Sequence, residues 1–408
     1  MRRRRSLQVL GGCLVGAVAG CTTGDRMFES YRYERDAPID GQAATPWRTL
    51  AHDSRRSGYA PYGQLPPETS ASVFADARQQ IEMQPTFIDG TAYFEARRAD
   101  PQDIGRLGPS GLKAADGRDD LWFVPESDTL ASPTVVGDAI FMTSDGTTRA
   151  LDRRDGALCW EYRAGVSHPA ACPTVVGDTV YVTGERVYAL AATTGEVQWA
   201  TTRPEGGAFH GTAATSAGVF ATARGDAWDG VYRFDPETGR EQWVTPTSSS
   251  LLVPPVFGEF VYVAEATGQL RALDPSDGTE AWARDLGGDS SAMPAVAEGT
   301  VYAAATNGDS LQTIDASTGD LRWESGFDAL NAKSPTVAGD SVYVPAGVHD
   351  GGLLYEFAAG TGRIRGTHEL PGAPTTPLVV GVDEGLVGTG SRSSGTKLQL
   401  LSRPDPDS

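Results

Sequence analysis

The chain has 408 residues, with 34 Lys and Arg against 53 Asp and Glu, and a formal net charge of −19. A surface this acidic repels phosphate backbones, so nucleic acid is excluded as an expected partner. Only three lysines occur (Lys113, Lys333 and Lys397), a balance typical of proteins that work in high salt, where ions screen self-repulsion. Simple solubility is the alternative interpretation.

Residues 1–20 predict a signal peptide. Four arginines precede a short apolar run, which falls below the roughly 20 residues needed to cross a bilayer. The stretch VAGC, residues 18–21, matches a lipobox, so we expect cleavage before Cys21 and lipid attachment to it. An ordinary cysteine after a signal is the alternative for Cys21. Export, by either the twin-arginine or the general route, would place the protein on the outer face of the cytoplasmic membrane.

The next part of the chain, residues 21–46, is polar and has no sustained apolar period, which predicts a flexible tether. A lead-in segment is expected over 47–70, before a repeat domain over 71–402 and a C-terminal tail over 403–408.

Two signatures recur along the repeat domain. One is a turn followed by tryptophan, as in LDRRDGALCW (151–160), FDPETGREQW (234–243) and IDASTGDLRW (314–323). The other is a strand pair, as in SPTVVGDAIFM (132–142) and SPTVAGDSVYV (334–344). Together they define eight units that start 39–48 residues apart, and repeats of this length indicate solenoids or propellers.

Each unit predicts four antiparallel strands. A Gly-Asp or Asp-Gly turn joins the first two, and an Asp-containing turn closed by Gly joins the last two. The recurrent aspartates are expected to form turns, with metal ligation as the alternative. The fourth strand carries a tryptophan whose flat ring suits the space between stacked sheets; the predicted inter-blade residues are Trp122, Trp160, Trp199, Trp243, Trp282 and Trp323. In the seventh unit Gly366 occupies this position, which predicts looser packing there.

We therefore predict an all-β fold, an eight-bladed β-propeller of four-stranded antiparallel blades. The eighth unit ends near residue 402 without a fourth strand. Residues 71–76 have strand character and precede the first unit, so we expect this N-terminal strand to close the ring and remove free edges. The two cysteines of the repeat domain, Cys159 and Cys172, fall on different strands and are expected to be free thiols, although an exported protein permits a disulfide.

The A-L-D-x-x-T-G-x-x-x-W turn and the P-T-V-x-x-x-x-V-Y strand pair resemble the repeats of the pyrroloquinoline-quinone (PQQ) enzyme family, over residues 71–402. One branch of that family contains quinoprotein dehydrogenases, which the resemblance associates with PQQ, calcium and a pair of adjacent cysteines. This sequence has no adjacent cysteine pair. The other branch contains non-catalytic lipoproteins, such as the propeller lipoprotein of the outer-membrane β-barrel assembly machinery, and the lipobox, tether and compact units are similar to that branch.

No serine-hydrolase elbow, phosphate loop or zinc-protease motif is present in the sequence. We therefore expect a non-catalytic scaffold that binds another envelope or surface protein, without cofactor or metal. A PQQ-dependent dehydrogenase using PQQ with calcium is the first alternative. A glycan-binding surface module, with Trp228 as its aromatic platform, is the second.

The residues before each first-strand proline should surround one mouth of the central channel. Most are small or apolar, but His210 and Lys333 stand out as polar. They are candidate contacts for an anion or small polar ligand, and solvated loop positions are the alternative.

Overall fold

All the elements described here are strands, in a computed structural model of the chain. The structure describes residues 49–404 except 80, 82, 100–106, 127–130, 166–171, 202–206, 226–228, 252, 289–291, 305–309, 329, 350 and 392–394. Within these residues no helix is long and apolar enough to cross a bilayer. The predicted signal peptide, the tether and most of the tail lie outside the described residues.

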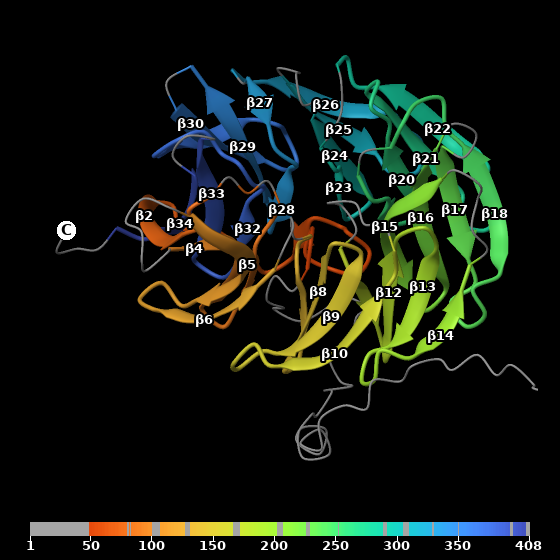
Figure 1. The fold of residues 1–408 in the computed structure, drawn as a ribbon. Coiled ribbons are helices and arrows are strands. Elements are labelled where there is room, and N and C mark those ends of the chain that lie inside the picture. The colour runs from red at the N-terminus through yellow and green to blue at the C-terminus, as the bar shows by residue number, and fades with distance from the viewer. Residues whose placement is uncertain are drawn as a thin grey trace, which may run out of the picture. The chain divides into compact units, whose positions relative to one another are not determined.

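The strands form eight blades arranged in a ring around a central axis (Figure 1). The first four blades run from the innermost to the outermost strand in chain order. They are β3 (Thr86–Ile88), β4 (Thr91–Ala99), β5 (Leu107–Ala115) and β6 (Asp120–Pro125); β7 (Thr134–Val136), β8 (Ala139–Ser144), β9 (Thr147–Asp152) and β10 (Leu158–Arg163); β11 (Thr174–Val176), β12 (Thr179–Thr183), β13 (Val187–Ala191) and β14 (Val197–Ala200); and β15 (Ala208–Thr215), β16 (Gly218–Arg224), β17 (Gly230–Phe234) and β18 (Glu241–Pro246).

Blades 5 to 7 repeat this order, with two short strands, β1 (Tyr59–Ala60) and β27 (Asn331–Ala332), added to the sheet of blade 7. They are β19 (Val256–Phe257), β20 (Val261–Ala264), β21 (Gln269–Leu273) and β22 (Glu280–Asp285); β23 (Ala295–Ala297), β24 (Thr300–Ala304), β25 (Ser310–Asp315) and β26 (Leu321–Gly326); and β28 (Thr336–Ala338), β29 (Ser341–Val348), β30 (Gly351–Ala358) and β31 (Ile364–Leu370), with β27 (Asn331–Ala332) also pairing with β29.

The eighth blade joins the two ends of the repeat domain. Its inner strands are β32 (Val379–Val380), β33 (Gly385–Ser391) and β34 (Gly395–Ser402), and its outermost strand is β2 (Ser70–Asp76) from the N-terminal side. β2 runs antiparallel to β34, with Ala71 opposite Leu401. The predicted eight-bladed propeller and its closure by an N-terminal strand are therefore confirmed.

The turn before each tryptophan follows from its sequence. In blade 4 the Asp235 carboxylate accepts backbone N–H groups of Glu237 and Thr238, at 3.1 and 2.9 Å. Gly239 then takes a φ of +66°, which a residue with a side chain adopts only under strain, and its N–H donates to the Asp235 carbonyl. In this turn the aspartate therefore bonds the backbone, as expected for a turn former.

The threonine of the P-T-V signature links neighbouring blades at the axis. The Thr86 hydroxyl donates to the Pro133 carbonyl of the next blade at 2.6 Å, and the Thr336 hydroxyl donates to the Leu378 carbonyl at 2.8 Å. These side chains are buried, and their hydroxyls satisfy carbonyls that the short inner strands leave unpaired.

Residues 49–65 of the lead-in segment lie in the middle of the ring, where Figure 1 shows the red and orange start of the described chain. Its β1 (Tyr59–Ala60) runs parallel to β28, the innermost strand of blade 7. Other carbonyls of the segment accept backbone N–H groups from the inner strands of blades 4 to 7: those of Ala214, Phe257, Val296 and Val337. The predicted channel is therefore filled at this level by the chain's own N-terminal side.

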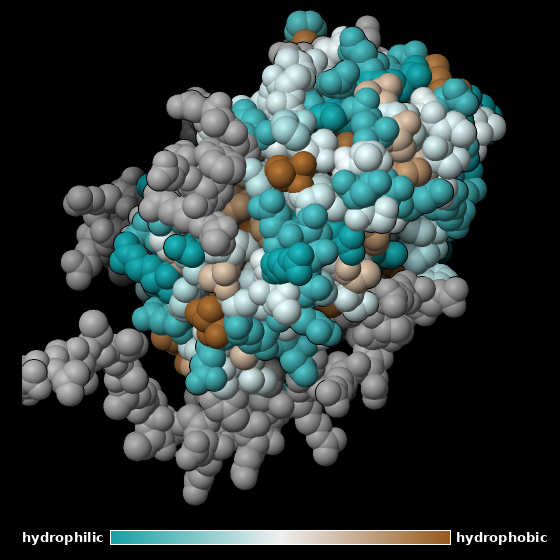
Figure 2. All heavy atoms as spheres, turned by 90° about the vertical axis from the view of Figure 1, so that its right-hand side faces the viewer, coloured by the Kyte–Doolittle hydropathy of each residue, from teal (hydrophilic) through white to brown (hydrophobic). Residues whose placement is uncertain are grey.

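The side of the ring that Figure 2 shows is mainly hydrophilic. Figure 2 shows the outer side of the blades that lie on the right of Figure 1, with hydrophobic residues scattered singly over a hydrophilic surface. Scattered apolar residues of this kind are normal on a folded protein.

Candidate functional site

Six joints between blades have the same construction. The tryptophan of one blade lies against the turn glycine of the next, and its indole N–H donates to a backbone carbonyl of that turn at 2.8–3.0 Å. The tryptophan and glycine pairs are Trp122 with Gly156, Trp160 with Gly195, Trp199 with Gly239, Trp243 with Gly278, Trp282 with Gly319, and Trp323 with Gly362.

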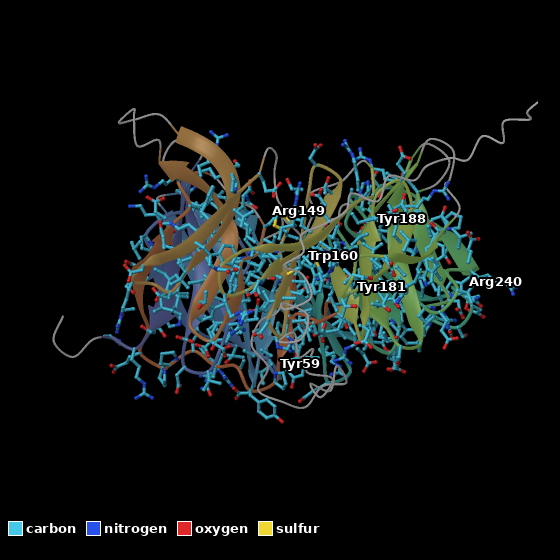
Figure 3. The ribbon with its side chains drawn as sticks, turned by 60° about the horizontal axis from the view of Figure 1, so that its bottom comes forward. Tyr59, Arg149, Trp160, Tyr181, Tyr188 and Arg240 are labelled. Carbon is cyan, nitrogen blue, oxygen red and sulfur yellow. The ribbon has the colours of Figure 1, made fainter. Side chains whose placement is uncertain are left out.

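The contact explains why the sequence repeats a glycine before each tryptophan. A methyl group on Gly319 would lie 2.7 Å from the Trp282 ring, closer than real carbon contacts allow. Each tryptophan also touches an aromatic residue of its own blade, such as Tyr181 beside Trp199 with ring centroids 5.8 Å apart. Figure 3 shows Trp160 and Tyr181 between the sheets. The structure thus places all six predicted tryptophans at inter-blade joints.

The joint between blades 8 and 1 uses a residue that the sequence analysis missed. Phe74 on β2 lies where a tryptophan lies in other blades, and a methyl group on Gly117 would be 2.7 Å from its ring. Phe74 also packs edge-to-face on Phe87, with ring centroids 5.7 Å apart. The available signal was an aromatic residue in the closing strand opposite the Asp-Gly turn of the first unit.

The joint between blades 7 and 8 has no aromatic ring at this position. Gly366 occupies the tryptophan position, and nothing lies within 4 Å of where its side chain would begin. The strand neighbour of Gly366 is Glu356, whose carboxylate accepts the Ser341 hydroxyl at 2.7 Å and lies 3.8 Å from the His368 imidazole. The imidazole beside it holds the pKa of Glu356 below its usual value, against the opposing effect of burial.

Arg56 fixes the lead-in segment on the axis. Its side chain is fully buried, and its guanidinium donates to groups in the segment and in blades 3 and 4 at 2.7–3.1 Å. The acceptors are the carbonyls of Leu50, Cys172 and Thr212 and the hydroxyls of Thr49 and Thr174. A buried guanidinium is costly unless its donors are paired, so this network requires the segment to be in place. The sequence analysis did not single out Arg56.

The residues predicted to surround the channel mouth are largely buried beneath this segment. The Gln84 amide accepts the backbone N–H of Ala51 at 2.8 Å and donates to the Leu378 carbonyl at 3.0 Å. His210, at a register shift in β15, is only 5% exposed, and Lys333, after β27, is half-buried. The burial of His210 does not fit a side chain in an open channel mouth.

The structure describes two of the other residues that the sequence analysis singled out. Cys159 is a half-buried free thiol and Cys172 a buried one, and burial raises the pKa of both. Cys21 and Trp228 lie outside the described residues.

The cavity described at the axis does not suit a quinone. The cavity between the lead-in segment and blades 1, 6, 7 and 8 has a volume of about 20 Å³, room for one water, whereas ligand pockets span roughly 300–1,000 Å³. Its lining includes Leu50, Ala51, Met293 and three prolines, without the carboxylates that calcium requires. In the described residues no three His, Cys, Asp or Glu side chains are grouped to hold a metal. The residues present therefore do not fit PQQ with calcium at this place.

Comparison with known proteins agrees with this geometry. A curated relative, the outer membrane protein assembly factor BamB of Moranella endobia (strain PCIT), is 26% identical over 273 residues, which are 64% of this chain and 60% of that protein. The crystal structure of BamB from Moraxella catarrhalis matches with a TM-score of 0.60 and 18% identity, covering 82% of this chain and 98% of that one.

A quinohemoprotein alcohol dehydrogenase from Comamonas testosteroni also matches, with a TM-score of 0.68, 14% identity, and 89% of this chain and 82% of that chain covered. Structural likeness at such low identity shows the shared propeller fold alone. A family model described as outer membrane protein assembly factor BamB matches residues 110–226 and 227–383. Because that match covers more than half of the sequence, the chain belongs to the family of the outer membrane protein assembly factor BamB.

Proposed function

We propose that this protein is a lipid-anchored, extracytoplasmic β-propeller that acts as a non-catalytic scaffold and binds another envelope protein. The observation that carries the proposal is the filled axis, because propellers that bind small ligands use that position and here Arg56 and the lead-in segment occupy it. The remaining surface is the rim and the loops of the blades, which suits protein recognition. Family membership supports the same choice, since the related assembly factor is named for its part in assembling outer-membrane proteins.

The anchor is proposed from the sequence VAGC at residues 18–21, with Cys21 as the acylated residue. A cleaved and acylated Cys21 would hold the propeller at the outer face of the cytoplasmic membrane by the polar stretch that follows. The Cys21→Ser variant should then appear in the medium, whereas the wild type stays with the membrane fraction. Membrane retention of the variant would contradict lipid attachment at this residue.

Crosslinking on intact cells tests the scaffold function. An affinity-tagged wild-type chain should crosslink to a defined envelope protein in repeated experiments, and a tagged exported protein of similar charge serves as the control. A wild-type chain that crosslinks to no envelope protein above this control would overturn the proposal.

An activity assay tests the dehydrogenase alternative. The purified protein is incubated with PQQ and calcium, then with alcohols or sugars and an artificial electron acceptor. No turnover is expected, because the axial residues do not fit the quinone. Turnover that requires added quinone would make the protein an enzyme and reverse the assignment.

A further inference from the structure

The joint between blades 1 and 2 contains an open groove of about 640 Å³, within the size range of binding pockets. It lies beside β6, the outermost strand of blade 1, and its floor and walls combine apolar and charged side chains. Its apolar lining includes Val124 on blade 1 and Leu151 and Leu158 on blade 2. Leu158 is 52% exposed, an unusual exposure for a leucine beside a cavity.

The neighbouring joint shows why the groove is open. Two residues after Trp160, Tyr162 packs edge-to-face on Tyr188 of blade 3, with ring centroids 5.4 Å apart, and these rings fill the space between the blades. At the joint between blades 1 and 2 the matching positions hold Val124 and Arg149. A short apolar side chain thus replaces a ring and leaves the space unfilled. Figure 3 shows Arg149 and Tyr188 on the same side of the ring.

Charged groups at the groove favour a basic occupant. Arg149 bonds the Glu126 carboxylate at 2.8 Å and the Glu161 carboxylate at 3.3 Å, so two carboxylates face one guanidinium. The Glu126 side chain is only 7% exposed, and burial raises its pKa, an effect that the Arg149 charge opposes. The cluster therefore carries an excess negative charge next to apolar surface, and a basic side chain from outside would neutralise it.

We propose that this groove, lined by Val124, Glu126, Arg149, Leu151 and Leu158, binds a segment of a partner protein that presents an apolar side chain beside a basic one. The apolar side chain fills the space that Tyr162 and Tyr188 fill at the next joint, and the basic side chain reaches Glu126 and Glu161. The inference rests on the proposed scaffold function and assigns it one surface.

The direct test uses a fluorescein-labelled synthetic peptide, Ser-Leu-Lys-Leu-Arg-Leu-Ser-Gly, and a matched peptide with Glu and Asp in place of Lys and Arg. Binding to the purified protein is followed by fluorescence anisotropy at two ionic strengths. The basic peptide should bind saturably and the acidic one much more weakly. Equal binding of the two, or no binding of either, would overturn the proposal.

Variants locate the site. Val124→Tyr fills the groove as Tyr162 fills the next joint, and Leu158→Ser removes the exposed apolar wall; each should weaken binding by at least about tenfold, as loss of one buried anchor does. Glu161→Gln should reduce the preference for the basic peptide.

Val197→Ser is the matched control, because Val197 lies two residues before Trp199 as Leu158 lies two before Trp160. Unchanged binding by Val124→Tyr and Leu158→Ser, or an equal loss in Val197→Ser, would contradict this location.

The same variants are used in the crosslinking experiment. Its results distinguish a failure of the scaffold function from a failure of the groove as the binding surface. If the wild type crosslinks to an envelope protein and Val124→Tyr keeps that partner fully, the scaffold function stands and the groove is not its surface. If the wild type crosslinks to no envelope protein, the scaffold function itself is overturned, while peptide binding still decides the chemistry of the groove. Circular dichroism and thermal unfolding confirm that each variant is folded.

Discussion

The space between neighbouring sheets is filled differently at two joints, the one between blades 5 and 6 and the one between blades 7 and 8. At the first, Trp282 lies on Gly319 and donates its indole N–H to the Ala316 carbonyl at 3.0 Å. At the second, Gly366 provides no ring, and blade 8 has no turn between its third and fourth strands because those strands come from opposite ends of the chain. A tryptophan there would lack the turn that receives it in other blades.

The lead-in segment supports the joint that lacks a ring. Its β1 pairs with β28 of blade 7, and the N–H of Gln64 donates to the Gly381 carbonyl of blade 8 at 3.1 Å. Leu65 is buried in the cluster that blades 7, 8 and 1 share, and its N–H donates to the Tyr343 hydroxyl oxygen at 3.3 Å. The difference shows that closing the ring removes one contact between a tryptophan and a turn glycine. The lead-in segment, which is not part of the repeat, supplies packing at that joint instead.

Trp282→Ala should show the largest effect. The change removes a ring that is 8% exposed together with its hydrogen bond, so the free energy of unfolding should fall by about 3–5 kcal/mol in urea titrations followed by circular dichroism. Trp282→Phe keeps a ring but loses the N–H donor and should cost about 1–2 kcal/mol. An alanine variant as stable as the wild type would contradict the structural role of the indole.

Leu65→Ala tests the joint between blades 7 and 8. Removing this buried side chain should cost about 2–5 kcal/mol. Because Leu65 packs on Gly385 and Leu378, amide hydrogen exchange should accelerate most in β31, β32 and β33. Uniform acceleration around the ring would show that the segment does not support this joint in particular.

Gly319→Ala compares the two joints through the same substitution. Gly319 has a φ of +77° and contacts the Trp282 ring, so the added methyl group should cost about 2–4 kcal/mol through backbone strain and overpacking. Gly366→Ala adds the same methyl group where nothing lies within 4 Å and should leave stability nearly unchanged. Similar losses in the two variants, measured by thermal unfolding, would refute the comparison.

Acid should weaken the joint between blades 7 and 8 through Glu356, and this is the smallest expected effect. The pKa of Glu356 lies below its ordinary value of 4.5 because of His368, so its carboxylate adds stability above that pH. This contribution is lost as the pH falls through the lower, folded-state value. The stability difference between wild type and Glu356→Gln, about 1 kcal/mol just above pH 5, should therefore shrink and vanish on acidification. A difference that persists at low pH would exclude ionised Glu356 as its source.

The repeated features of this molecule were predictable from its sequence. The turn around Asp235 and Gly239 uses groups a few residues apart, so its chemistry is visible in one segment of the chain. The closing strand was predictable because one unit lacked a strand and an unused one stood at the other end. The filled axis was not, because three of the five acceptors of Arg56 lie more than 100 residues away, in Cys172, Thr174 and Thr212.

The sequence by itself determined the number of blades, the order of their strands and the spacing of the ring residues. Each unit of about forty residues contains the turn and strand chemistry that it needs, so this information is local. Only the tertiary structure decided that residues 49–65 fill the axis, that Phe74 closes the ring, and that a groove opens at Val124 and Arg149. Those features depend on which distant segments meet and on how well unlike side chains fill the same position.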